Sequence, residues 1–206
     1  MSHGDHEELS PALERRLAAM VEAEVARRVA PIEAQLADAR ARLAEAERRA
    51  PSDRASILVF SGDLDHLLSA FIIATSAAAM GLQASMYFTF WGLVALKKTT
   101  IFAGKSVPER LLALMLPGGP ADVGPSRFAM LGGGRVMFEH LMRTRNVESL
   151  PGLIAVAREL GVKLIACQMA MDVMGVRREE LLDGIEFGGA ITYMSEAMDS
   201  RVTLFI

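Results

Sequence analysis

Apolar residues in the first fifty positions of the chain recur at alternating steps of four and three. The steps run through Val25, Val29, Ile32, Leu36, Ala39, Leu43 and Ala46. This spacing is a heptad seam, and charged residues flank it on both sides. Leu13 and Leu17 continue the stripe upstream, with a change of phase near Val25. The pattern predicts a long amphipathic helix over residues 1–50, which we interpret as a coiled coil that assembles with other chains.

Composition leaves an alternative open for this helical arm. The segment holds eight arginines and ten acidic residues but no lysine and no aromatic residue. Alanine at seam positions weakens association, and Pro31 either kinks the helix or restarts it as a first-turn proline. The alternative is a solvated helix that lies against its own domain. In either case residues 1–50 contain no candidate catalytic side chain.

Residues 51–206 form a second domain, in which short apolar runs alternate with amphipathic stretches. Strands are predicted at 56–60, 84–90, 162–166, 184–187 and 202–206, and helices at 64–80, 150–160, 176–182 and 189–198. Gly81 and Gly161 follow two of these helices, where glycine commonly ends a helix. Strands that alternate with helices in this way are typical of βαβ units. The sequence therefore predicts an α/β fold, a small doubly wound parallel sheet with helices on both faces, preceded by the helical arm.

The stretch from Leu67 to Leu96 contains no Asp, Glu, Lys or Arg. Its length would suit a membrane span, but Gly81–Ser85 divides it into one piece of helix length and one of strand length. The second piece is rich in aromatic and bulky apolar side chains, as buried strands are. We expect a buried core here, and peripheral contact with a membrane is the alternative that remains open.

A long insertion separates the second and third predicted strands, at about residues 99–149. It contains the loop-forming run from Pro117 to Pro125 and the glycine-rich run 131–134, and its basic residues outnumber its acidic ones. Long glycine-rich loops in compact domains are commonly lids or binding loops. We expect a mobile, mildly basic lid over the site, with simple disorder as the alternative.

Charge and motif content exclude several classes of function. A net charge of −3 argues against a general nucleic-acid binder, and a single cysteine excludes an intrachain disulfide. The acidic start of the chain lacks the apolar core of a signal peptide, so we expect a cytoplasmic protein. No phosphate loop, dinucleotide fingerprint or metal-type cysteine pair occurs, so we predict neither a cofactor nor a metal.

Cys167 is the candidate that carries chemistry. It follows a predicted buried strand and precedes residues that suit a helix, a position where backbone N–H groups and the helix dipole favour a thiolate. Met171 and Met174 share its helical face at i+4 and i+7, a set of soft ligands that would suit Cu(I). Ordinary helix packing is the favoured interpretation of the methionines, and an inert packed thiol is the alternative for Cys167.

Further residues are candidates for a pocket or lid around the cysteine. Asp63 and His66 begin the helix after the first strand, where helix capping is the competing role. Trp91 would wall the pocket unless it belongs to the core. Lys97 and Lys98 would add positive potential unless both are solvated surface residues. The set of candidates is Asp63, His66, Trp91, Lys97, Lys98, Gln168 and Met171.

Residues from about Ala55 to Ile206 resemble the DsrE/DsrF/DsrH-like proteins, in particular a longer DsrE-like branch with an inserted segment. The runs that carry the resemblance are Ser61–Asp65, Phe88–Leu93, Leu116–Pro120, Leu164–Gly175 and Gly188–Ala190. The resemblance implies a small doubly wound α/β fold that assembles into oligomers, here homo-oligomers.

The same resemblance implies a sulfur carrier or sulfurtransferase, in which the persulfide-bearing cysteine maps onto Cys167. Such proteins pass sulfur to and from partners such as TusA-like and rhodanese-like proteins. The helical arm at residues 1–50 is not part of the family pattern. Some relatives lack a working cysteine and serve structural roles, so a non-catalytic assembly subunit is the alternative function. Membrane association has been suspected in this branch because of the same apolar stretch.

Overall fold

The computed structural model describes residues 11–49, 52–126 and 133–206. The chain divides into two compact units, residues 1–50 and residues 51–206. Part of the glycine-rich run at 131–134, which we expect to be flexible, lies outside the described residues.

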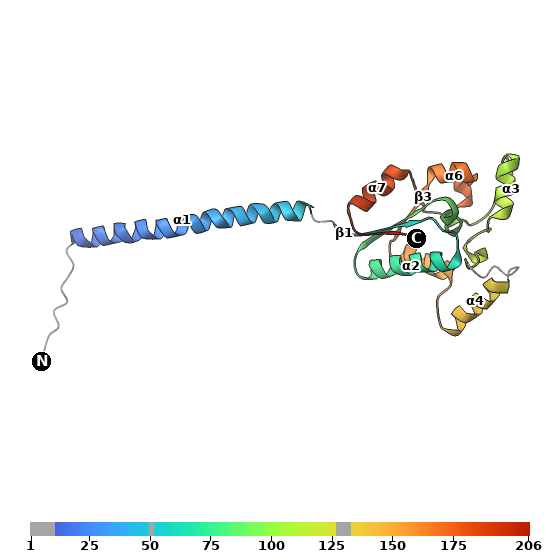
Figure 1. Cartoon of the computed structure of the whole chain (residues 1–206), viewed down its shortest axis with the longest axis horizontal. Helices are drawn as coiled ribbons and strands as arrows, with labels where there is room; N and C mark the ends of the chain where they lie inside the picture. The colour runs from blue at the N-terminus through green and yellow to red at the C-terminus, as the bar shows by residue number, and fades with distance from the viewer. Residues whose placement is uncertain (1–10, 50–51, 127–132) are drawn as a thin grey trace. The chain divides into compact units, whose positions relative to one another are not determined.

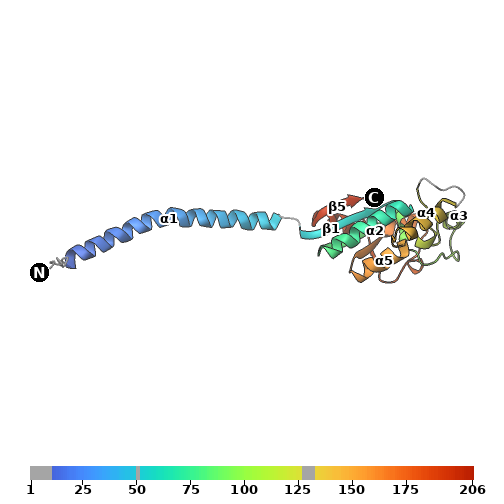
Figure 2. The ribbon, with the colours of Figure 1, turned by 90° about the horizontal axis from the view of Figure 1, so that it is seen from below.

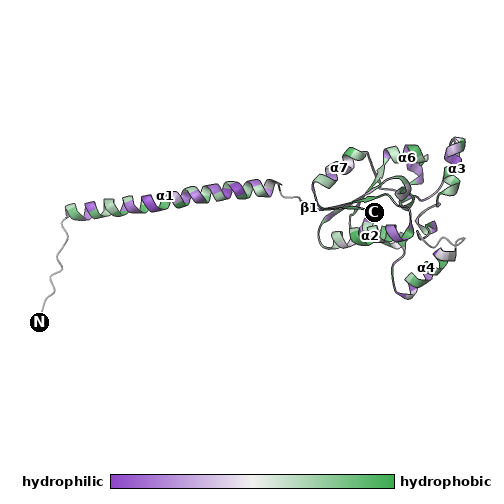
Figure 3. Ribbon diagram, viewed as in Figure 1, coloured by the Kyte–Doolittle hydropathy of each residue, from purple (hydrophilic) through white to green (hydrophobic). Residues whose placement is uncertain are grey.

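The described residues of the first unit form one helix, α1 (Pro11–Arg49), which continues without a break through Pro31. Hydrophobic and hydrophilic residues interleave along its whole length (Figure 3). The large apolar side chains of the seam are exposed, with fractions between 39% for Val29 and 62% for Ile32. The prediction of a long N-terminal helix is therefore confirmed, and its seam faces solvent.

The second unit is built on one parallel sheet. Its strands are β1 (Ser52–Val59), β2 (Gln83–Phe88), β3 (Lys163–Cys167), β4 (Glu186–Gly188) and β5 (Ser200–Phe205). The strands lie in the order β4-β3-β2-β1-β5, and every neighbouring pair is parallel. Each predicted strand is present, with ends shifted by one to four residues.

Helices cover both faces of this sheet (Figure 1). On one face α2 (Leu64–Ala79) packs with α5 (Leu150–Glu159), and Figure 2 shows this pair side by side. On the other face lie α6 (Gln168–Met174) and α7 (Ala190–Met198). This arrangement confirms the prediction of a doubly wound α/β fold.

The uncharged stretch supplies much of the core. Leu67 and Phe71 from α2 and Met86 and Phe88 from β2 are all fully buried, and the Phe71 and Phe88 rings lie 5.8 Å apart. Gly81, with a φ of +88°, makes the turn between the helix and the strand. Among the described residues, no helix combines the length and the apolar character that crossing a bilayer requires.

The insertion contains helices that the sequence analysis missed. These are α3 (Val107–Met115) and α4 (Gly133–Thr144), with a short 3-10 turn η2 (Pro120–Asp122) between them. Ser106 and Glu109 form a capping box at the start of α3, where the Ser106 N–H donates to the Glu109 carboxylate at 2.6 Å. The pattern Ser-x-x-Glu is a sequence signal for the start of a helix and could have predicted α3.

The predicted helix at 176–182 is reduced to the 3-10 turn η4 (Arg178–Glu180) because Glu180 points into the protein. Its fully buried carboxylate accepts hydrogen bonds from Lys105 Nζ at 2.8 and 3.0 Å and from the N–H groups of Ile101 and Arg177 at 2.6 and 2.7 Å. Burial alone would raise the pKa of Glu180, but these hydrogen bonds outweigh it and hold the pKa below its ordinary value.

Replacing Lys105 with methionine should therefore destabilise the fold strongly. The change leaves the buried Glu180 carboxylate without its charged partner, and breaking a buried ion pair in this way costs about 3–5 kcal/mol. Urea unfolding at neutral pH measures the loss. Lys98→Met is the matched control, because Lys98 binds the exposed Asp183 and its loss should change stability little.

The same ion pair sets a dependence on pH. The pKa of Glu180 is lowered in the folded protein. The ionised carboxylate therefore contributes stability at pH values above its ordinary pKa of 4.5, and this contribution is lost as the pH falls through the lowered pKa. The difference in free energy of unfolding between wild type and Lys105→Met should therefore become smaller as the pH is lowered through this range. A difference in free energy of unfolding that stayed constant down to low pH would contradict the role assigned to Glu180.

Candidate functional site

The carboxyl ends of the three central strands meet at one edge of the sheet. Val59 of β1 pairs with Phe88 of β2, Phe88 pairs with Ala166 of β3, and Cys167 lies one residue further along β3. In open α/β sheets, ligands commonly bind beyond this edge. The candidate site is therefore assembled from segments that directly follow β1, β2 and β3.

Cys167 stands at the junction between strand and helix. It is the last residue of β3 and the N-cap of α6, and the C-cap of α6 is Gly175, whose φ is +64°. The side chain is buried, with 4% of the residue exposed. The sequence placed the thiol at the end of a buried strand, and the structure has it there.

Tyr87 is the polar side chain that accompanies Cys167, and the sequence analysis missed it. Tyr87 pairs with Ile165, two residues before Cys167, so both side chains project from the same face of the sheet. Its hydroxyl donates to the carbonyl oxygen of Gly188 at 3.3 Å, and Gly188 is the residue that pairs with Cys167. Burial, followed by the hydrogen bond and charge of Cys167, raises the pKa of Tyr87 well above its ordinary value. Tyr87 therefore remains a hydrogen-bond donor beside the thiol.

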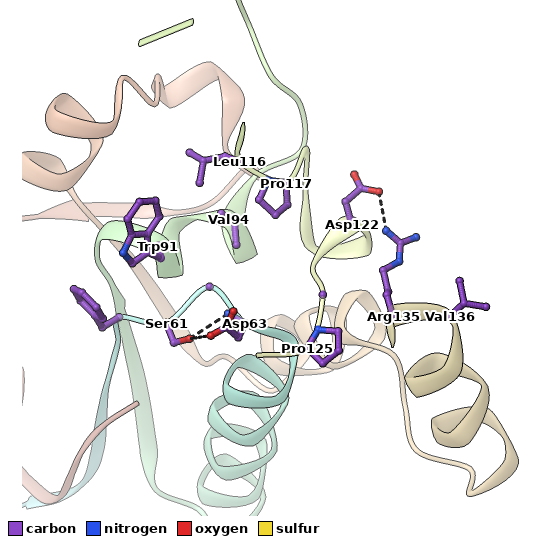
Figure 4. A pocket seen from close by; sticks show the side chains of 13 residues that line it. Ser61, Asp63, Trp91, Val94, Leu116, Pro117, Asp122, Pro125, Arg135 and Val136 are labelled. Carbon is purple, nitrogen blue, oxygen red and sulfur yellow. Dashed lines mark hydrogen bonds and ion pairs between the residues drawn. The ribbon is translucent and has the colours of Figure 1, made fainter. Parts of the chain in front are cut away.

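A pocket of about 670 Å³ opens at the same edge of the sheet (Figure 4). Asp63 and Trp91, two of the predicted pocket residues, both line it, and Cys167 is not among its lining residues. Figure 4 shows Trp91 and Val94 on one side and Arg135 and Val136 of α4 on the other. Trp91 is 45% exposed, so the alternative that it belongs to the core is wrong.

Two glycines fix the position of Trp91. The 3-10 helix η1 (Phe90–Leu96) crosses the end of β1 so closely that a Cβ on Gly92 would lie 2.4 Å from the Val59 carbonyl oxygen. A Cβ on Gly62 would lie 2.7 Å from the Trp91 carbonyl oxygen. The carbonyl oxygen of Phe60 accepts from the Gly92 N–H at 2.9 Å. Glycine is thus required at both positions by close backbone approach.

Asp63 and His66 lie at the start of α2. Asp63 occupies the N-cap position, but its carboxylate makes no capping hydrogen bond and instead accepts from the Ser61 hydroxyl at 3.1 Å. His66 Nδ1 lies 3.8 Å from Asp63 and 3.7 Å from Asp65, and its side chain is about half exposed. His66 is not one of the residues that line the pocket of Figure 4.

Lys97 and Lys98 differ sharply in their surroundings. Lys97 is 2% exposed and donates to the Thr100 hydroxyl at 2.9 Å and to the Pro117 carbonyl oxygen at 3.1 Å. Burial lowers its pKa. The alternative that both lysines are solvated is therefore wrong for Lys97, whereas Lys98 is exposed and binds Asp183 at 2.7 Å. Their predicted action on a persulfide stays a prediction.

The residues of α6 separate into two groups. Met171 and Met174 belong to the hydrophobic core, each 5% exposed, which favours packing as their role. Gln168 is exposed, and with Met171 it lines a second pocket that also includes Arg177 and Arg178. In the described part of the chain, no three side chains of His, Cys, Asp or Glu converge as metal ligands.

Comparisons with known proteins bear on this arrangement. The chain is 40% identical over 154 residues to the uncharacterised protein YrkE of Bacillus subtilis, a match that covers 74% of this chain and 96% of YrkE. It is 31% identical over 160 residues to the sulfur carrier protein DsrE2 of Allochromatium vinosum, covering 73% of this chain and 96% of DsrE2. A crystal structure of the ychN protein from E. coli matches with a TM-score of 0.45 and 12% identity, over 74% of this chain and 99% of that one.

The sequence model of the DsrE/DsrF/DrsH-like family matches residues 51–205, which is the whole α/β unit except Ile206. Together with the identity to two relatives along nearly their full length, this match shows the family directly. The chain belongs to the DsrE/DsrF/DrsH-like family.

Proposed function

We propose that this protein is a sulfur carrier, which holds sulfane sulfur as a persulfide on Cys167 and passes it between partner proteins. Membership of the family and the 31% identity to a protein named as a sulfur carrier support a role in sulfur relay. The single observation that carries the residue assignment is the position of Cys167, the only cysteine of the chain, at the carboxyl edge of the sheet.

The proposed chemistry is a thiol exchange that balances without a cofactor. The Cys167 thiolate attacks the outer sulfur of a donor persulfide, a new S–S bond forms, and the donor's own thiolate leaves with the electron pair of the broken S–S bond. The reverse step, with an acceptor thiolate as the nucleophile, unloads the carrier. We propose rhodanese-like and TusA-like proteins as the donors and acceptors in this exchange.

Burial of Cys167 has two consequences for a carrier. Because only 4% of Cys167 is exposed, its sulfur is shielded from reduction and oxidation, and a second protein reaches it only after local movement. The seven-residue helix α6 follows directly, and its outer face carries the exposed Gln168. Opening of this short helix upon docking would expose the sulfur while the sheet stays intact.

Tyr87 fits a supporting role in this exchange. Its hydroxyl stays protonated, and the hydroxyl proton that now reaches the Gly188 carbonyl can turn toward an anionic sulfur on Cys167. Hydrogen bonds to charged groups are stronger than those to neutral ones. We therefore assign Tyr87 to stabilising the sulfur anion before and after transfer.

A non-catalytic assembly subunit is the second candidate function. The long exposed α1 would organise partners, and the burial of Cys167 would then reflect packing alone. This alternative predicts that the protein takes up no sulfur. It is separated from the carrier function by the loading experiment that follows.

Incubation with a low-molecular-weight persulfide donor should add one sulfur atom to the wild-type chain. Intact mass spectrometry should show a gain of about 32 Da that a reductant reverses, because a persulfide is opened by thiol exchange. Cys167→Ser is the matched control and should show no gain, while its circular dichroism stays unchanged because serine is nearly isosteric. Absence of the reversible adduct with every donor would leave the assembly-subunit function as the better account.

Replacing Tyr87 with phenylalanine should slow sulfur loading by roughly tenfold to a hundredfold, since a hydrogen bond to a charged group contributes about 1.5–3 kcal/mol. The loading rate is measured by quenching single-turnover reactions and following the intact mass. Tyr193→Phe is the control, because Tyr193 contacts the Tyr87 ring at 5.5 Å and the change removes a hydroxyl from the same ring pair. Equal loading rates in wild type and Tyr87→Phe would remove Tyr87 from the proposed chemistry.

A further inference from the structure

The exposed seam of α1 has a regular heptad register from Val25 onward. With Val29 assigned to position a, the a positions are Val29, Leu36 and Leu43, and the d positions are Val25, Ile32, Ala39 and Ala46. The five large apolar side chains in this set are between 39% and 62% exposed. Pro31 falls at position c, outside the seam, so it does not interrupt the apolar surface.

Charges beside the seam follow the same register. Arg28 and Arg42 occupy position g, with Gln35 between them, and Glu33 and Glu47 occupy position e. In a parallel pair of helices, a g residue faces the e residue five positions later on the partner helix. Arg28 of each helix would thus face Glu33 of the other, and Arg42 of each helix would face Glu47 of the other.

Both arginines are already oriented by their own helix. Arg28 Nε donates to Glu24 Oε1 at 2.7 Å, and Arg42 Nε lies 2.9 Å from Asp38 Oδ2. The acid in each case lies one turn earlier, at position c on the outer side. A guanidinium group has five N–H donors, so the donors on its far side can bind a second carboxylate. The intrahelical pairs therefore prepare the arginines for contacts across the seam.

We propose that α1 binds α1 of a second copy of this chain in a parallel, in-register coiled coil over residues 25–47. The charge pattern selects this geometry. In an antiparallel pair, g positions of one helix face g positions of the other, and e positions face e positions. Arg28 would then face Arg42, and Glu33 would face Glu47, so both contacts would join like charges. A parallel pair shifted by one heptad sets Arg28 against Arg40. Only the parallel, in-register pair makes every charged g–e contact attractive or neutral.

Parallel pairing has a consequence for the α/β units, which follow the carboxyl ends of the two arms. Both units would be attached at the same end of the paired helices, so two α/β units would be presented together. The alanines at Ala39 and Ala46 bury less apolar area than leucine would, so the association should be reversible. This inference does not depend on the proposed sulfur chemistry.

Disulfide trapping in the full chain tests the orientation. In a Cys167→Ser background, Val25→Cys and Leu43→Cys each place one thiol on the seam, near opposite ends of the paired region. Mild oxidation should convert both variants to covalent dimers. Ala34→Cys is the matched control, since it lies at position f on the outer face and should stay monomeric on a non-reducing gel.

Trapping at both seam positions, and not at the control, is the expected result. An antiparallel pair would bring no more than one of the two seam positions close to its own copy, so trapping at one position overturns the proposal. Trapping at neither position would show that the seams of two copies do not meet, and also overturns the proposal.

Charge reversal provides an independent measurement by sedimentation equilibrium. Glu33→Arg with Glu47→Arg turns the four interhelical pairs repulsive and should weaken association through α1 on the order of tenfold or more. Adding Arg28→Glu and Arg42→Glu restores attraction in the parallel register and should recover the wild-type association. Equal association in all three proteins would contradict the assigned register.

Discussion

The buried carboxylate of Glu180 holds together the edge of the sheet on which the candidate site depends. It joins the segment that follows η1 to the segment that follows α6, through Lys105 and the N–H groups of Ile101 and Arg177. Its own carbonyl oxygen accepts from the Lys98 N–H at 2.8 Å, and the Leu182 N–H donates to Leu96 at 2.8 Å. A side chain that is fully buried and charged is tolerated only because all of these donors are present. The start of the insertion and the end of α6 are thereby tied to each other.

This constraint bears on how a buried cysteine can serve as a carrier. The segment after α6 is fixed by Glu180 and the strand before it is fixed in the sheet, so α6 is a short helix held at both ends. Movement that exposes Cys167 is then confined to about two turns of helix, and the core around β2 and β3 stays packed. The arrangement favours a thiol that is protected at rest and reached through local opening rather than through global unfolding.

Much of the α/β unit was predictable because its signals are local. Apolar runs marked each strand, Gly161 and Gly81 marked two helix ends, and the position of Cys167 followed from the strand before it. The helices of the insertion were not predicted. The start of α3 carries a local signal in Ser106 and Glu109, but the glycine and proline content of the insertion obscured it.

Tyr87 and the Glu180–Lys105 pair could not be found in this way, because both depend on contacts between distant segments. Tyr87 faces Cys167 only in the observed register of β2 against β3, and Glu180 is 75 residues from Lys105 in the sequence. The sequence pattern places Glu180 in a predicted helix at 176–182, whereas long-range pairing makes it the most deeply buried charged residue among those that the structure describes.

The central claim is that Cys167 can react while the protein remains folded, and its alkylation by iodoacetamide measures this most directly. The rate should be compared across denaturant concentrations below the unfolding transition, with hydrogen exchange of the sheet as the record of global opening. The account predicts alkylation of the native chain at a rate that barely changes with denaturant, because local opening of α6 exposes little surface. Alkylation that occurs only as fast as the sheet itself unfolds would contradict it.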